Sequence, residues 1–146
     1  MIITFCGHKS VSNADEVWEW LDNVLDQFIH EDELIFYLGG YGSFDLLAAS
    51  VVRQKKRLNP QIQAVLVIPY LNRESGEDGY DYTVYPPLES VPPRYAISKR
   101  NEWMVMQADV VVAYVTYGWG GAAKALEYAQ RKKKRILLYP DKGLEC

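Results

Sequence analysis

The sequence predicts an α/β fold with a doubly wound, mainly parallel sheet of five strands and helices on both faces. Five short runs rich in Val, Ile and Leu alternate with longer amphipathic segments, and most of these runs end in glycine or proline. Continuous apolar strands spaced by helices are typical of a parallel sheet that is covered on both sides. Right-handed crossovers then give a Rossmann-like arrangement, in which ligands bind at the carboxyl ends of the strands, where the strand order reverses.

The first half of the chain supplies three strands and two helices. The first strand is closed by Gly7, and Asn13 or Asp15 can cap the helix that follows it. The second strand is closed by Gly39-Gly40 and the third by Pro69. The expected order is a strand over 2–6, a helix to about His30, a strand over 34–38, a helix over 44–58 and a strand over 64–68.

Residues 70–95 break this rhythm with five tyrosines and two Pro-Pro pairs. We expect a lid-like loop here, because long loops within a compact domain often have a function. A helix to about Ala108, a strand over 110–115, a helix opened by Gly118–Gly121 that ends near Lys133, and a strand over 135–139 complete the chain. Residues 1–146 are therefore expected to form a single domain.

Composition excludes several classes of function. The net charge of −3 disfavours broad binding of nucleic acid, which needs an electropositive face. Cys6, Cys146, His8 and His30 lack the spacing of metal ligands, so no metal is expected. The junction at Gly39 is not the G-x-G-x-x-G of a standard NAD fingerprint, and no cofactor is expected. The longest apolar stretch, Val110–Val115, is too short to cross a membrane. Without a signal peptide or a disulfide framework, a cytoplasmic protein is expected.

Two glycine-rich junctions predict a binding site for an anion. Gly39, Gly40 and Gly42 precede one helix, and Gly120 and Gly121 precede another. Glycines allow close approach to the backbone, and a helix N-terminus offers free N–H groups to a phosphate. The first junction fits a tight strand-to-helix turn equally well.

Charged residues near the second junction extend this hypothesis. Lys124 lies in the first turn of its helix, where a bound anion would favour a cation, although a solvated lysine explains it equally. Glu127 is three residues further on and shares its face, as a simple surface Lys–Glu pair would. His8, which follows Gly7, is expected either to contact ligand or to cap a turn.

The segment from Arg94 to Met104, in which a helix begins at about Tyr95, adds three candidate ligand contacts, Arg94, Arg100 and Asn101. Arg100 is four residues before Met104 and so borders the apolar stripe of this helix. Arginine suits planar contact with phosphate, although an arginine that crosses the surface is the commoner case. Asn101 lies beside apolar positions and would need buried hydrogen-bond partners, which favours a site.

Several of these motifs resemble the SLOG superfamily over the whole chain. Phe5-Cys-Gly7, Tyr37-Leu-Gly-Gly40, Arg100-Asn-x-x-Met104 and Gly120-Gly-x-x-x-x-x-Glu127 occur in its order. That superfamily includes the Lonely-guy phosphoribohydrolases and the DNA-processing protein Smf/DprA. Tyr85–Glu89, Pro92–Ile97 and Trp119–Ala122 are similar to signatures of a small bacterial branch. The resemblance implies a Rossmann-like fold that binds nucleotides or nucleotide-derived signals, often as a homodimer.

The phosphoribohydrolases use an arginine and a glutamate as a catalytic pair. The resemblance implies that Arg100 and Glu127 would be this pair if the chain is an enzyme. Ala123-Lys124 stands where those enzymes have a glycine and a threonine, and Asn101 stands where they have a lysine. These departures favour a domain that binds or senses a nucleotide-type ligand without established catalysis. The alternatives are a hydrolase of the N-glycosidic bond of a nucleoside 5′-monophosphate, and a protein-interaction module whose pocket is vestigial.

Overall fold

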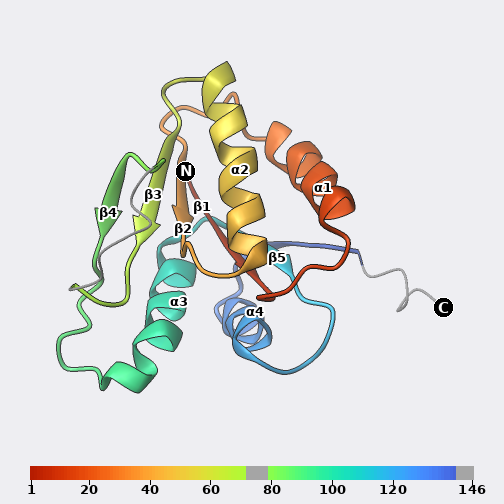
Figure 1. Cartoon of the computed structure of the whole chain (residues 1–146). Helices are drawn as coiled ribbons and strands as arrows, with labels where there is room; N and C mark the ends of the chain where they lie inside the picture. The colour runs from red at the N-terminus through yellow and green to blue at the C-terminus, as the bar shows by residue number, and fades with distance from the viewer. Residues whose placement is uncertain (72–78, 141–146) are drawn as a thin grey trace.

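The computed structural model describes residues 1–71 and 79–140. In this part of the chain, six parallel strands form one sheet in the order β4-β3-β2-β1-β5-β6 (Figure 1). The strands are β1 (Ile2–Gly7), β2 (Ile35–Leu38), β3 (Gln63–Val67), β4 (Tyr82–Val84), β5 (Val110–Tyr114) and β6 (Arg135–Leu138). The helices are α1 (Ala14–Asp26), α2 (Ser43–Leu58), α3 (Ala96–Gln107) and α4 (Gly121–Arg131), with a short 3₁₀ turn η1 (Pro93–Tyr95) before α3. The Rossmann-like α/β fold is confirmed.

The predicted count of five strands is wrong, because β4 lies within the segment expected to be a loop. β4 has only three residues, too few for an apolar run or an alternation to stand out. Asp81 attaches it to β3: its side chain accepts the Ala64 N–H at 2.7 Å, and its own N–H donates to the Ala64 oxygen at 2.7 Å. Residues 72–78 of the expected lid-like loop lie outside the described residues.

The helices cover both faces of the sheet, as predicted. Figure 1 shows α1 and α2 packed together on one face and α3 and α4 on the other. Side chains alternate along β5 between the two layers: Val110 and Val112 pack with α1 and α2, whereas Val111 and Ala113 pack with α3 and α4. Since β5 is buried throughout, it reads in the sequence as a continuous apolar run.

α1 ends four residues before the expected end near His30. The N–H groups of Gln27 and Phe28 donate to the oxygens of Val24 and Leu25, so the bonds after the helix span three residues rather than four. This tighter pattern converts the end of the helix into turns. Phe28 is nevertheless buried in the core, which explains why the apolar periodicity continues past the helix.

Parallel pairing brings the glycine-rich turns to one edge of the sheet. Gly7 ends β1, Gly39 follows β2, and Gly120 follows β5, and all three strands run in the same direction. From β1 the chain first adds β2, β3 and β4 on one side, then crosses to place β5 on the other side. The strand order therefore reverses between β1 and β5, where a ligand site is expected in this fold.

Candidate functional site

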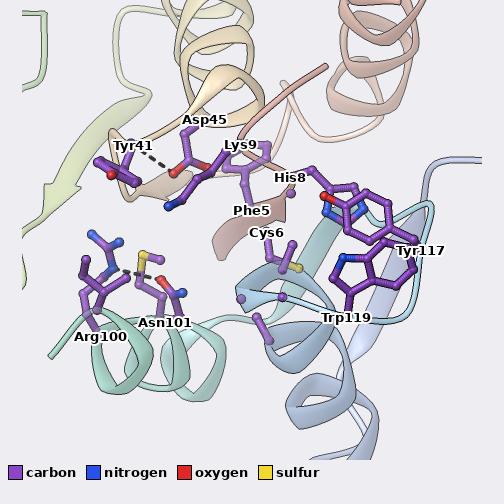
Figure 2. Close-up of a pocket in the computed structure, with 17 residues that line it drawn as sticks. Phe5, Cys6, His8, Lys9, Tyr41, Asp45, Arg100, Asn101, Tyr117 and Trp119 are labelled. Carbon is purple, nitrogen blue, oxygen red and sulfur yellow. Dashed lines mark hydrogen bonds between the residues drawn. The ribbon is translucent and has the colours of Figure 1, made fainter. Parts of the chain in front are cut away.

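A cavity of about 440 Å³ opens at the carboxyl ends of β1 and β5. Its walls come from the end of β1, the start of α2, one side of α3 and the loop that leads from β5 into α4 (Figure 2). We call it the main cavity. It is lined by Phe5, Cys6, Gly7, His8, Lys9, Tyr41, Asp45, Ile97, Arg100, Asn101, Met104, Tyr117, Trp119, Gly120, Gly121, Ala122 and Ala125.

A second cavity of about 230 Å³ adjoins the first between α3 and α4. The two share the lining residues Ile97, Asn101, Gly121 and Ala125. We call this smaller space the side cavity. Arg94, Ser98, Glu102 and Lys124 complete its lining, so two cations flank it. The main and side cavities together form one continuous region around the start of α4.

Arg100 reaches from α3 across the ends of β2 and β3. Its side chain is 3% exposed, and its NH1 group donates to the oxygens of Gly39 at 3.2 Å and Val67 at 2.8 Å. Its Nε group donates to the side-chain oxygen of Asn101 at 2.9 Å. These bonds hold the guanidinium rigidly at the floor of the main cavity. Arg100 therefore positions charge in the site and also joins α3 to two strand ends.

Asp45, the third residue of α2, faces the same floor. A Cβ atom on Gly39 would lie 2.9 Å from the Asp45 Oδ2 atom and 3.2 Å from the Arg100 Cζ atom, so both side chains converge on this glycine. The Oδ2 atom accepts the Tyr41 N–H at 3.3 Å (Figure 2). Burial raises the pKa of Asp45 to about 6, although the Arg100 charge and the Tyr41 hydrogen bond act to lower it. The site thus holds a carboxyl group that titrates near neutral pH.

Three aromatic rings form a stack at the opposite side of the main cavity (Figure 2). The His8 ring stacks on Tyr117 with centroids 3.7 Å apart, and Tyr117 stacks on Trp119 with centroids 4.2 Å apart. His8 is 4% exposed and accepts the Thr116 N–H at its Nε2 atom at 2.8 Å, so the neutral ring carries its proton on Nδ1. Burial lowers the pKa of His8 and favours this neutral form. Trp119 is 70% exposed at the rim.

The N-terminus of α4 lies between the two cavities. Gly120 precedes it with φ of 91°, a conformation that favours glycine, and no side chain caps the helix. The first intrahelical bond is donated by Lys124 to the Gly120 oxygen, so the N–H groups of the preceding residues have no helical acceptor. The first turn contains no acidic residue and carries Lys124. The local charge at this helix end is therefore positive.

Most of the candidate residues predicted from the sequence line one of the two cavities, but some do not. Gly7, His8, Arg100, Asn101, Gly120 and Gly121 line the main cavity, and Arg94 and Lys124 line the side cavity. Gly39 contacts the floor through Arg100 and Asp45, whereas Gly40 approaches Leu66 and Gly42 approaches Lys9. Glu127 is exposed on α4 and lines neither cavity.

Sequence reasoning missed several residues that line the main cavity, namely Lys9, Tyr41, Asp45, Tyr117 and Trp119. Asp45 had a recognisable signal, because it closes the glycine-rich junction that begins at Gly39. Lys9 lies two residues after the end of β1 and Tyr117 three residues after the end of β5, which places them at the edge where a ligand site is expected.

Within residues 1–71 and 79–140, no group of three or more His, Cys, Asp or Glu side chains could hold a metal ion. In the same ranges, no helix is both long and apolar enough to span a membrane.

No protein-family model and no curated protein matches the sequence of this chain. Solved structures match its fold. DNA processing protein A from Helicobacter pylori aligns with a TM-score of 0.68 and 12% identity, over 97% of this chain and 66% of that chain. The molybdenum cofactor carrier protein from Chlamydomonas reinhardtii aligns with a TM-score of 0.62 and 18% identity, over 94% of this chain and 75% of that one. A protein designated TM1055 aligns with a TM-score of 0.60 and 18% identity, over 92% of this chain and 71% of that chain. At these identities, the likeness establishes the fold alone.

Proposed function

We propose that this chain binds a nucleotide or a nucleotide-derived small molecule in the main and side cavities, as a binding or sensing domain without established catalysis. Gly121 carries this proposal. It begins α4, lines both cavities, and would meet no atom within 4 Å if it had a Cβ. Its φ lies outside the left-handed region, so the backbone does not require glycine there. A ligand that approaches the backbone closely supplies the missing reason.

The charges around Gly121 favour an anionic group on that ligand. The free N–H groups at the start of α4 face the region where Arg94 and Lys124 flank the side cavity. A cation in the first turn disfavours the helix by itself, but it becomes favourable when an anion binds at the same end. A phosphate at the start of α4 would satisfy all of these groups together.

The main cavity suits the remainder of such a ligand. Its volume lies within the usual range for small-molecule sites, about 300–1,000 Å³, and it combines apolar walls with a few fixed polar groups. The exposed Trp119 ring, which stacks on Tyr117, offers aromatic surface at the rim for a planar ring. The nucleoside part of the ligand would lie here, with its phosphate toward the side cavity.

The position of Glu127 supports binding over hydrolysis. A carboxylate that acts on the N-glycosidic bond must reach the sugar, and Glu127 is exposed outside the lining of both cavities. We also propose that the chain is a SLOG-type domain, since its motifs resemble that superfamily over the whole chain. The same fold occurs in a carrier of the molybdenum cofactor, which supports a small-molecule ligand.

A thermal-shift experiment with a matched pair of variants tests this function. Wild type is heated with nucleoside mono- and diphosphates, ADP-ribose and phosphate-free nucleosides. A ligand at one hundred times its Kd adds about 2.7 kcal/mol to the free energy of unfolding, so a phosphorylated member of the panel should raise Tm. Gly121→Ala should keep or slightly raise the Tm of the free protein, because alanine fits an ordinary helical residue better, but should abolish the ligand shift.

Gly118→Ala is the control for that variant. Gly118 also has open space around it, but it lines neither cavity. This variant should therefore keep the full ligand shift. A panel that gives no shift with wild type, or equal shifts with all three proteins, would contradict the proposal.

The hydrolase alternative is tested by release of free base from nucleoside monophosphates. We expect no turnover by wild type. Robust release that is lost in Glu127→Ala would establish the enzyme instead.

A further inference from the structure

We propose that Asp45 selects the ligand: its carboxylate, opposite Arg100 across Gly39 at the floor of the main cavity, binds hydrogen-bond donors on the nucleoside part. This inference rests on the proposed nucleotide binding and assigns its specificity to one side chain. The donors are neutral hydroxyl or amino groups, which belong either to the ribose or to the base. Asp45 would thus contact the nucleoside end of the ligand, which lies away from the phosphate.

The carboxylate of Asp45 accepts few hydrogen bonds from the protein itself. A carboxylate in the first turn usually binds the N–H groups of its own helix, but α2 has no side-chain cap. The Oδ2 atom accepts the Tyr41 N–H. The Oδ1 atom has no donor among the described residues and is not a buried, unsatisfied atom, so it is accessible from the main cavity. Asp45 is half-buried at the wall of the main cavity, and desolvation raises its pKa to about 6 although the Arg100 charge and the Tyr41 N–H act to lower it. A group kept at such a cost is typical of a functional site.

The neighbours of Asp45 define what it can bind. Arg100 directs its NH1 and Nε groups to the oxygens of Gly39, Val67 and Asn101, and its positive charge acts on Asp45. The Lys9 amine lies over the Tyr41 ring, 5.1 Å from its centroid. An ionised carboxylate accepts hydrogen bonds and donates none, so its ligand partner must be a donor. It would also repel a phosphate, which directs the phosphate toward the start of α4.

The charged and titratable groups that face Asp45 come from several elements. Arg100 lies on α3 and Lys9 lies in the loop after β1. Burial, reinforced by the Asp45 charge, raises the pKa of Cys6 on β1 to about 12, and it also raises the pKa of Tyr80 beside Gly40. Burial lowers the pKa of His8 and favours its neutral form. Affinity that falls as the pH drops through about 6 therefore has two causes, protonation of Asp45 and protonation of the ligand's phosphate.

The experiment compares wild type, Asp45→Asn and Asp15→Asn by titration calorimetry. The ligands are AMP, GMP, CMP and UMP with their 2′-deoxy counterparts, each at about pH 8 and about pH 5.5, on either side of the Asp45 pKa. Asp45→Asn keeps the shape and one acceptor oxygen but removes the charge. Asp15 is an exposed carboxylate in the first turn of α1 that lines neither cavity, so Asp15→Asn is the matched control.

We expect Asp45→Asn to bind the preferred monophosphate about tenfold or more weakly at the higher pH, as loss of a hydrogen bond to a charged group predicts. Asp15→Asn should match wild type. Wild type should lose more affinity than Asp45→Asn when the pH is lowered, since protonation of the ligand phosphate affects both proteins alike. If ribose supplies the donors, Asp45→Asn abolishes the preference for ribo- over deoxyribonucleotides. If the base supplies them, it abolishes the preference among the four bases.

Three results separate the failures. If wild type binds none of the nucleotides, the proposed function fails, and this inference fails with it. If wild type binds and Asp45→Asn keeps the same affinity and the same preferences, this inference alone is overturned. If Asp45→Asn does not fold, wild type decides the matter: a ribose or base preference that does not decrease between the higher and the lower pH overturns the inference.

Discussion

Gly7 and Gly121 show how different the reasons for a glycine can be. Gly7 ends β1, and a Cβ there would lie 2.2 Å from the Phe44 ring, so glycine is what lets this strand pass the start of α2. Gly121 begins α4, and a Cβ there would meet nothing within 4 Å. Packing within the chain accounts for the first glycine and leaves the second unexplained. The sequence does not reveal these reasons: Gly7 is a single glycine after a strand and Gly121 ends a glycine-rich junction, and both are expected near the site.

Side chains at the site were predictable where helical spacing placed them. Arg100 was expected at the border of an apolar stripe because it precedes Met104 by four residues, and both line the main cavity. Its bonds to the oxygens of Gly39 and Val67 were not predictable, since those residues are distant in sequence and are brought together only by the parallel sheet. Asp45 was missed for the same reason: its environment depends on α3.

Asp45 should destabilise the folded protein when it is ionised. Its pKa is about 6 in the folded chain and near 3.8 in an exposed one, so the folded state binds more protons between these values. Stability is therefore lost as the pH rises through this window. We expect Asp45→Asn to raise the free energy of unfolding by about 1–3 kcal/mol near pH 8, since one pKa unit corresponds to about 1.4 kcal/mol. Urea unfolding at several pH values measures this difference.

The gain from Asp45→Asn should shrink as the pH falls and approach zero below about pH 3, where the wild-type carboxyl is protonated in both the folded and the unfolded state. A variant that is equally stable or less stable than wild type at the higher pH would show that the ionised carboxylate is well accommodated. Combined with weaker nucleotide binding, a gain in stability would mark Asp45 as a residue that favours function over stability.

Among the elements, the longer strands were predictable and β4 was not. β1, β3 and β5 are apolar runs because helices cover both of their sides. β4 lies at the edge of the sheet, has three residues and exposes Tyr82, so it lacks that pattern. Its position depends on single contacts. Asp81 binds the backbone of Ala64 and pairs with Lys56, and the Ile68 N–H donates to the Val84 oxygen at 2.9 Å.

Asp81→Ala should loosen this edge of the sheet. Burial acts to raise the pKa of Asp81, but hydrogen bonds from Lys56 and from the Ala64 N–H lower it overall. The ionised form therefore stabilises the fold, with the opposite sign to Asp45. We expect a loss of about 1–2 kcal/mol at neutral pH, mainly from the unsatisfied Ala64 N–H, because an exposed pair with Lys56 adds little.

The pH dependence of this loss checks its cause. The stabilisation by Asp81 is present above its ordinary pKa and lost as the pH falls through its lowered value, so wild type and Asp81→Ala should converge in acid. Hydrogen exchange at the Ala64 and Ile68 amides should accelerate in the variant. Unchanged exchange at both amides would refute the role assigned to Asp81.

At the scale of the whole molecule, the position of the site was predictable because parallel strands impose it. Glycines that end separate strands must gather at one edge, and the reversal of strand order between β1 and β5 marks the place on that edge. The shape of the site was not predictable. The main cavity needs α2 from one layer and α3 and α4 from the other, and their separation is set by packing across the entire sheet.

The homodimer stays a prediction that the resemblance to SLOG proteins supports. The high aromatic content also suggested a dimer interface, but several of these aromatic side chains pack against one another within one chain. Trp20 packs on Tyr139 and Trp103 on Tyr37, while the exposed Trp119 lines the main cavity. Light scattering should give twice the chain mass of 16.8 kDa, and a monomer at high concentration would refute the dimer. All the groups on which the binding proposal rests belong to one chain, so nucleotide affinity should not depend on protein concentration. An affinity that falls on dilution to the monomer would instead place a residue of the second copy in the site.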